Sequence, residues 1–199
     1  MLGIISSDPE VATVTHGLTP LGRESASAAA AEVIARAKDL GCGVAICSSD
    51  FLRARETATI VHEAISAEGI PVWPSARVLL RRELRERHFG DFDGGPDSGY
   101  ANVWREDAID ASHERHGVES VASVLSRSIG LVRTLAAEPE LLADPWMLLV
   151  VAHGDVLQIM QTHFARVNPS THRSLDHLPT ATLRALGSLP SPDSDTTRR

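Results

Sequence analysis

The sequence predicts a single α/β domain in which helices cover both faces of a mostly parallel sheet. Strand-like and helix-like segments alternate along the chain, which is typical of parallel sheets. Two runs, residues 43–48 and 146–152, are apolar almost throughout, as strands buried on both faces are. The chain has 199 residues, of which 43% are hydrophobic and 23% charged, and this suits one ordinary globular domain.

The first half of the chain contains two predicted helices and two predicted strands. Thr19 and Pro20 indicate a helix start, with threonine as the N-cap and proline in the first helical position. Gly41 is placed to end this helix near residue 40. The elements that follow are a strand, a helix and a short strand, at residues 43–48, 50–67 and 70–73.

Residues 74–117 break this pattern with glycines and charges, and contain one predicted short helix at residues 100–106. An irregular stretch of this length inside a compact domain is usually functional or disordered. Regular elements resume as a helix, a strand, a helix and a last edge strand, at residues 118–137, 146–152, 155–165 and 180–186. The strand at 146–152 is the most apolar and is predicted to be central. The domain is expected to span residues 1–187, followed by a disordered tail, 188–199.

Composition and charge exclude several classes of protein. A net charge of −7 argues against a nucleic-acid partner. No apolar stretch reaches the roughly 20 residues that a membrane span needs, so no membrane partner is expected. Cys42 and Cys47 have no cysteine partners elsewhere and are predicted to be free thiols, which suits a reducing, cytoplasmic location. The oligomeric state cannot be predicted.

Two predicted strand ends carry side chains suited to phosphate binding, because ligands of open α/β sheets bind beyond the carboxyl ends of the strands. After the strand 43–48, a helix presents Arg53 on its first turn, and guanidinium groups bind phosphate bidentately. After the strand 146–152 comes His153, and Gly154 lets the backbone approach a ligand closely. Taken singly, such residues are more often structural or solvated.

The irregular segment holds two further clusters of basic residues. Four arginines, at positions 81, 82, 85 and 87, could either attract anionic substrates or form a solvated rim. His113 and His116 resemble part of a zinc signature, but they are three residues apart rather than four. They are predicted to be ordinary loop residues, and no metal site is expected.

The order of the motifs resembles that of the histidine phosphatase (phosphoglycerate-mutase-like) superfamily. The likeness rests on a Thr-Pro-x-Gly helix start, a Ser-to-Arg phosphate motif, a glutamate-bearing loop, a Glu-Ser helix start and a second His-Gly. These features occur in that order at residues 19–22, 49–57, 84–90, 119–120 and 151–154. The resemblance covers about residues 3–186 and implies a three-layer α/β/α fold.

The resemblance also implies a role for each matching residue. Arg53, with Gly154, would bind phosphate, and His153 would donate hydrogen bonds to the phosphoryl oxygens. Glu86 would protonate the leaving oxygen, a step in which a positioned acid typically contributes about 10²–10⁴-fold. The implied activity is hydrolysis of a small phosphomonoester through a phosphohistidine, without a metal or cofactor. A phosphatase is favoured over a mutase, and the substrate stays unidentified.

One part of the family pattern has no match in this sequence. The family's first strand ends in an Arg-His-Gly motif, whose histidine becomes phosphorylated. The nearest candidate here is His16, but no arginine precedes it, and Leu18-Thr19-Pro20 follows without room for the usual loop. The first central strand and its nucleophile are therefore expected to lie upstream of Met1. The alternative to an active phosphatase is a catalytically inactive truncated product or a phosphate-binding pseudo-enzyme.

The structural consequences are specific. Arg53, Glu86 and His153 should converge at the carboxyl ends of the strands. The backbone of residues 147–152 should lack a partner on one side, unless residues 3–6 act as a substitute strand.

Overall fold

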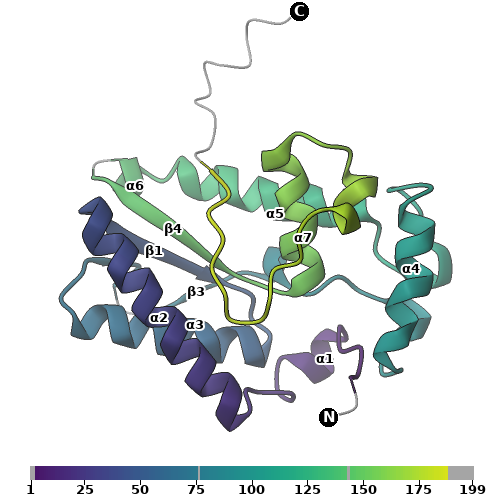
Figure 1. Ribbon diagram of the computed structural model, residues 1–199, viewed down its shortest axis with the longest axis horizontal. Helices are drawn as coiled ribbons and strands as arrows, with labels where there is room; N and C mark the ends of the chain where they lie inside the picture. The colour runs from purple at the N-terminus through teal and green to yellow at the C-terminus, as the bar shows by residue number, and fades with distance from the viewer. Residues whose placement is uncertain (1–2, 76, 143, 188–199) are drawn as a thin grey trace, which may run out of the picture.

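The structure is a computed structural model that describes residues 3–75, 77–142 and 144–187 (Figure 1). It has three layers, with helices α2 (Pro20–Leu40) and α3 (Leu52–Ala67) on one face of a sheet and α5 (Val121–Ala136) and α7 (Gly154–Ala165) on the other. The predicted three-layer α/β/α class is confirmed. The predicted tail, 188–199, lies outside the described residues. None of the helices in the described ranges is long and apolar enough to span a bilayer.

The strand β1 (Gly43–Ser48) is fully buried and organises the four-stranded parallel sheet. It pairs along its whole length with β4 (Trp146–Val151), from Gly43 opposite Trp146 to Ser48 opposite Val151. Two short strands, β2 (Val72–Trp73) and β3 (Leu79–Leu80), pair with its first and second halves. Since all pairings are parallel, the carboxyl ends of β1 and β4 meet at one edge.

The prediction that the strand at 146–152 is central is wrong for the described sheet, where β4 pairs with β1 alone. Side chains of β4 pack against the helices on both faces, and all six residues are half-buried. A continuous apolar run therefore indicates that both faces are covered, and not that both edges are paired. Residues 3–6 do not replace a strand beside β4, because Ile4 bridges Pro96 and the Ile5 amide donates to the Gly95 carbonyl.

Local signals explain why the long helices begin and end where they do. The Gly22 amide donates to the Thr19 hydroxyl at 3.1 Å, and Gly41 ends α2 with a φ of 61°. Ser120 caps α5 by accepting from the Ser123 amide at 3.2 Å. The remaining helices are α1 (Pro9–Ala12), α4 (Tyr100–Asp107) and α6 (Pro139–Leu142), and the 3-10 helices η1 (Arg82–Leu84), η2 (Gly90–Phe92), η3 (Asp97–Gly99), η4 (Arg115–Gly117) and η5 (Pro169–Ser174).

The predicted edge strand at 180–186 is wrong. Ala181 has a φ of 55°, in the left-handed region that an extended strand does not use. The Thr182 amide donates to the Pro179 carbonyl, which closes a turn at this point. Leu183 nevertheless packs against the cluster between α2, α3 and the sheet, so the apolar pattern of this segment reflects burial without sheet pairing.

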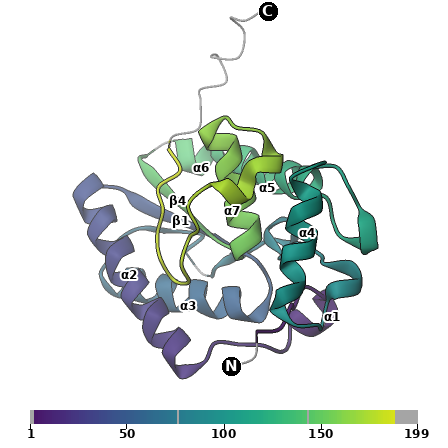
Figure 2. The ribbon, with the colours of Figure 1, turned by 45° about the vertical axis from the view of Figure 1, so that its right-hand side comes forward.

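The irregular segment and the first residues of the chain lie together beside the carboxyl ends of the strands (Figures 1 and 2). The Ser7 hydroxyl donates to Asp93 at 2.6 Å and accepts from the Phe89 amide at 3.0 Å. These contacts join the N-terminal segment to residues 89–93, and α1 and α4 lie at the same end of the molecule, where they form a rim beside the carboxyl ends of the strands (Figure 2).

Candidate active site

His153 and Ser49 meet just beyond the paired ends of β4 and β1. The Ser49 amide donates to the Val151 carbonyl at 2.9 Å, which aligns the two strand ends. His153 Nε2 lies 2.9 Å from Ser49 Oγ, and the imidazole is 5% exposed. Ser49 Oγ also accepts from the Phe51 amide at 3.2 Å, so this hydroxyl ties the histidine to the start of α3.

The buried ring of Phe51 joins His153 to Arg53. The centroids of the Phe51 and His153 rings are 5.2 Å apart, and Arg53 Cζ lies 5.6 Å from the Phe51 centroid. The distance from Arg53 Cζ to the centroid of the His153 ring is therefore no more than the sum of these two distances. Arg53 Nη2 also donates to the Ser6 carbonyl at 3.2 Å, so the N-terminal segment borders the site.

Glu86 is the third residue predicted for the site, and in the described ranges no hydrogen bond or ring contact joins it to Arg53 or His153. Its Oε1 accepts the amide of the next residue, Arg87, at 3.0 Å. Burial, followed by the negative charge of Asp155, raises the pKa of Glu86 to about 7, while Arg53 and Arg127 act in the opposite direction. A carboxyl group with this pKa holds a proton in part of the molecules at neutral pH, which general acid chemistry requires.

His153 has the opposite electrostatic character. Its burial, together with the nearby charges of Arg53 and Arg127, holds the pKa of His153 well below its usual range. The imidazole is therefore neutral at pH 7, with one ring N–H to donate and one ring nitrogen to accept. Arg53 and Arg127 supply positive charge near His153, and Arg85, whose Cζ lies 5.7 Å from the Phe51 ring centroid, is paired with Asp50.

Arg127 of α5 is a site residue that sequence reasoning missed. It forms a two-point ion pair with Glu119, at 2.8 and 2.9 Å, and its Nη1 donates to the Glu83 carbonyl at 2.6 Å. The predicted Glu119-Ser120 helix start therefore holds an arginine beside the loop that carries Glu86. Arg127 lies within an apolar helix pattern, and no local signal distinguishes it from a solvated arginine.

The sequence left two alternatives for the arginines at positions 81, 82, 85 and 87, a cluster that attracts anionic substrates or a solvated rim. Their environments differ, so neither alternative describes the cluster as a whole. Arg85 forms a two-point ion pair with Asp50, at 2.7 and 2.6 Å, and Arg87 is completely buried. Arg81 is half-buried, and Arg82 is exposed.

Arg87 is the centre of a buried ionic network. It donates twice to Asp107, at 2.7 Å each, once to Asp155, at 3.2 Å, and once to the Glu119 carbonyl, at 2.6 Å. His113 Nε2 lies 2.8 Å from Asp107, so this histidine supports the network. The two carboxylates that bind Arg87 lie 20 and 68 residues away from it in the sequence, and such separations leave no trace in local sequence patterns.

His16 lies outside these contacts. It is exposed, with a φ of 58°, and the amide of Leu18 donates to Glu56 of α3 at 2.6 Å. Within the described ranges, no hydrogen bond or ring contact joins His16 to Arg53, Glu86 or His153.

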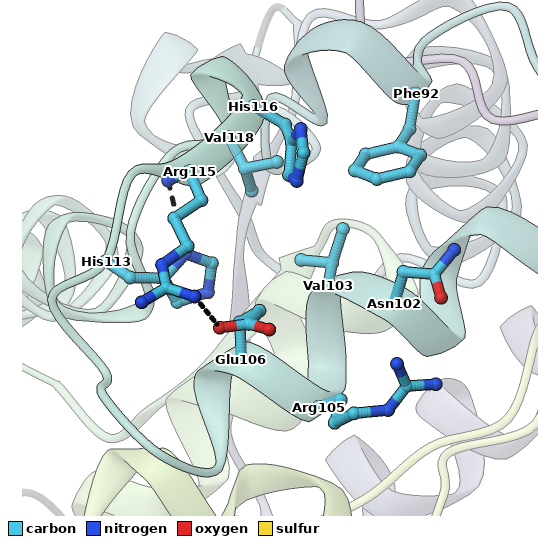
Figure 3. A pocket seen from close by; sticks show the side chains of 9 residues that line it. All are labelled: Phe92, Asn102, Val103, Arg105, Glu106, His113, Arg115, His116 and Val118. Carbon is cyan, nitrogen blue, oxygen red and sulfur yellow. Dashed lines mark hydrogen bonds and ion pairs between the residues drawn. The ribbon is translucent and has the colours of Figure 1, made fainter.

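A separate groove of about 370 Å³ lies between α4 and η4 (Figure 3). Arg105, Arg115 and His116 border it, and Arg115 is paired with Glu106 at 2.6 Å. Arg53, Glu86 and His153 do not line this groove, so it is distinct from the strand-end site.

Comparison with known proteins agrees with the observed fold. The model of the histidine phosphatase superfamily (branch 1) matches residues 10–188. No curated protein matches the chain. The native structure of a mycobacterial glucosyl-3-phosphoglycerate phosphatase is similar, with 28% identity, a TM-score of 0.65, and coverage of 90% of this chain and 85% of that chain.

Two further solved structures extend this likeness. The mycobacterial glucosyl-3-phosphoglycerate phosphatase in complex with VO3 matches with 29% identity, a TM-score of 0.63, and coverage of 90% of this chain and 87% of that chain. The α-ribazole phosphatase from Shigella flexneri shares the fold at 20% identity, with a TM-score of 0.57 over 90% of this chain and 79% of that chain.

Proposed function

This chain belongs to the histidine phosphatase superfamily, and we propose that its strand-end site binds the phosphoryl group of a small phosphorylated substrate for phosphomonoester hydrolysis. The observation that carries the proposal is the shared contact of Arg53 and His153 with Phe51 at the carboxyl ends of β1 and β4. Glu86, whose pKa is raised to about 7, is the acid in this proposal. The similar mycobacterial structure is that of a glucosyl-3-phosphoglycerate phosphatase, which supports a phosphatase over a mutase.

Each residue has a stated role in this proposal. Arg53 and His153 donate to the phosphoryl oxygens, over which charge spreads during transfer. Glu86 protonates the leaving oxygen. Gly154, at the first position of α7, adds a backbone donor at a helix N-terminus, where anions bind favourably. A Cβ atom built on Gly154 would meet no atom within 4 Å, so there is space beside this backbone for a ligand.

The proposed reaction passes through a phosphohistidine, and we expect its nucleophile to be neither His153 nor His16. His153 is engaged with Ser49, and in the part of the chain that the structure describes no hydrogen bond joins His16 to Arg53 or His153. These observations favour a second candidate function for the chain as it stands, that of a protein that binds phosphate without hydrolysing its esters. Both candidates require the same phosphate-binding groups.

Isothermal titration with inorganic phosphate tests the requirement that they share. We expect the chain to bind phosphate, and Arg53→Met to lower its affinity at least tenfold, because a charge-assisted hydrogen bond contributes about 1.5–3 kcal/mol. Arg55→Met is the matched control, since residue 55 lies two positions further on α3 and points about 200° around the helix. An equal loss in both variants, or no binding by the unmodified chain, would contradict the proposed function.

A further inference from the structure

Asp155 connects four separate segments of the chain at the site. It lies on the first turn of α7, two residues after His153, and its side chain is 4% exposed. Its Oδ1 accepts from Trp104 Nε1 of α4 at 3.1 Å, and its Oδ2 accepts from Arg87 Nη1 at 3.2 Å. His172 Nε2 of η5 lies 3.6 Å from Oδ1. The helix that carries His153 is thus tied to the rim and to the Glu86 loop.

The negative charge of Asp155 is retained inside the protein. Burial alone would raise its pKa, but contacts with His172 and Arg87 outweigh burial, and the pKa of Asp155 is lowered. Two buried carboxylates, Asp155 and Asp107, share the single guanidinium of Arg87. A second guanidinium, that of Arg173 in η5, lies 3.8 Å from Asp155 Oδ1 but is partly exposed, so the fully buried part of the network holds two carboxylates and one guanidinium.

Glu86 is coupled to this charge through its neighbour in the chain. The backbone amide of Arg87 donates to Glu86, and the guanidinium of the same residue binds Asp155. Asp155 is the main charge that raises the pKa of Glu86, while Arg53 of α3 and Arg127 of α5 lower it. On α4, burial and the charges of Glu86 and Asp155 raise the pKa of Tyr100.

We propose that Asp155 is a positioning residue for Glu86: through the guanidinium of Arg87 it fixes the loop that carries Glu86 against α7 and holds a buried negative charge at that loop. The inference rests on the proposed function only for the role of Glu86 as the acid. Asp107 offers a matched comparison, because it binds the same guanidinium but is not one of the principal charges acting on Glu86.

The test follows the side-chain carboxyl of Glu86 by ¹³C NMR during a pH titration of the full chain, with Glu86→Gln used to assign the resonance. The unmodified chain should show a midpoint at about 7. Asp155→Asn removes the neighbouring negative charge, so the midpoint should fall by about one pH unit or more. Asp107→Asn disturbs the same arginine and should produce less than half of that shift.

A midpoint unchanged in Asp155→Asn would overturn the proposal, and so would equal shifts in the two variants, which would indicate loop repacking alone. If Asp155→Asn loses its cooperative thermal transition, the paired variant Arg173→Gln/Asp155→Asn removes a cation together with the anion, leaves the Arg87–Asp107 pair in place and still reports the midpoint. There too a lower midpoint supports the proposal, and an unchanged one rejects it. Phosphate titration is independent of this readout, so failure of the proposed function would be seen separately.

Discussion

Hydrolysis of p-nitrophenyl phosphate by the 199-residue chain is expected to stay near the uncatalysed rate, and His16→Ala should leave that rate unchanged. A nucleophile, its charge-stabilising donors and its acid act as a unit, so phosphate-binding groups without a nucleophile forfeit most of the catalysis. Robust turnover that disappears in His16→Ala would contradict this expectation and would make His16 the nucleophile.

Phosphatase activity is expected when the nucleophile is supplied. In a fusion that places a strand ending in Arg-His-Gly ahead of Gly3, hydrolysis of phosphomonoesters should appear. Glu86→Gln should then lower turnover of alkyl phosphates by about 10²–10⁴-fold, because their leaving oxygen must be protonated. The loss should be smaller for p-nitrophenyl phosphate, whose leaving group hardly needs a proton. An equal loss on both substrates would argue against Glu86 as the acid.

A second large effect is expected on stability. Asp107→Ala should lower the free energy of unfolding by about 3–5 kcal/mol, because it removes one partner of a buried ion pair and leaves Arg87 without its two-point contact. Urea unfolding measures this difference directly. Asp39→Ala, on the exposed side of α2, is the control and should change the value by no more than about 0.5 kcal/mol. Similar values for the two variants would show that the network does not stabilise the fold.

Local signals made the layers and the ends of the long helices predictable. Thr19, Pro20 and Gly41 each act on the backbone within a few residues, and the boundaries of α2 follow from them. The position of His153 was predictable because parallel strands bring their carboxyl ends together. The edge position of β4 was not, since an apolar run specifies which faces are covered and leaves strand order open.

The electrostatic part of the site could not be predicted in the same way. Arg87 and Arg82 are both arginines of one short segment, yet one is fully buried and the other exposed. Their difference depends on Asp107 and Asp155, which reach Arg87 only after the chain has folded. The raised pKa of Glu86 likewise depends on the folded structure, through burial and the charge of Asp155, so the sequence pattern identified the residue without its electrostatic environment.

The location of bound orthovanadate in a crystal structure of this chain tests the central claim most directly. The account predicts that the oxyanion lies between the Arg53 guanidinium and the His153 imidazole, beside Gly154 and within reach of Glu86. Orthovanadate found only in the groove between α4 and η4, against Arg105 or Arg115, with His153 still paired to Ser49, would contradict it.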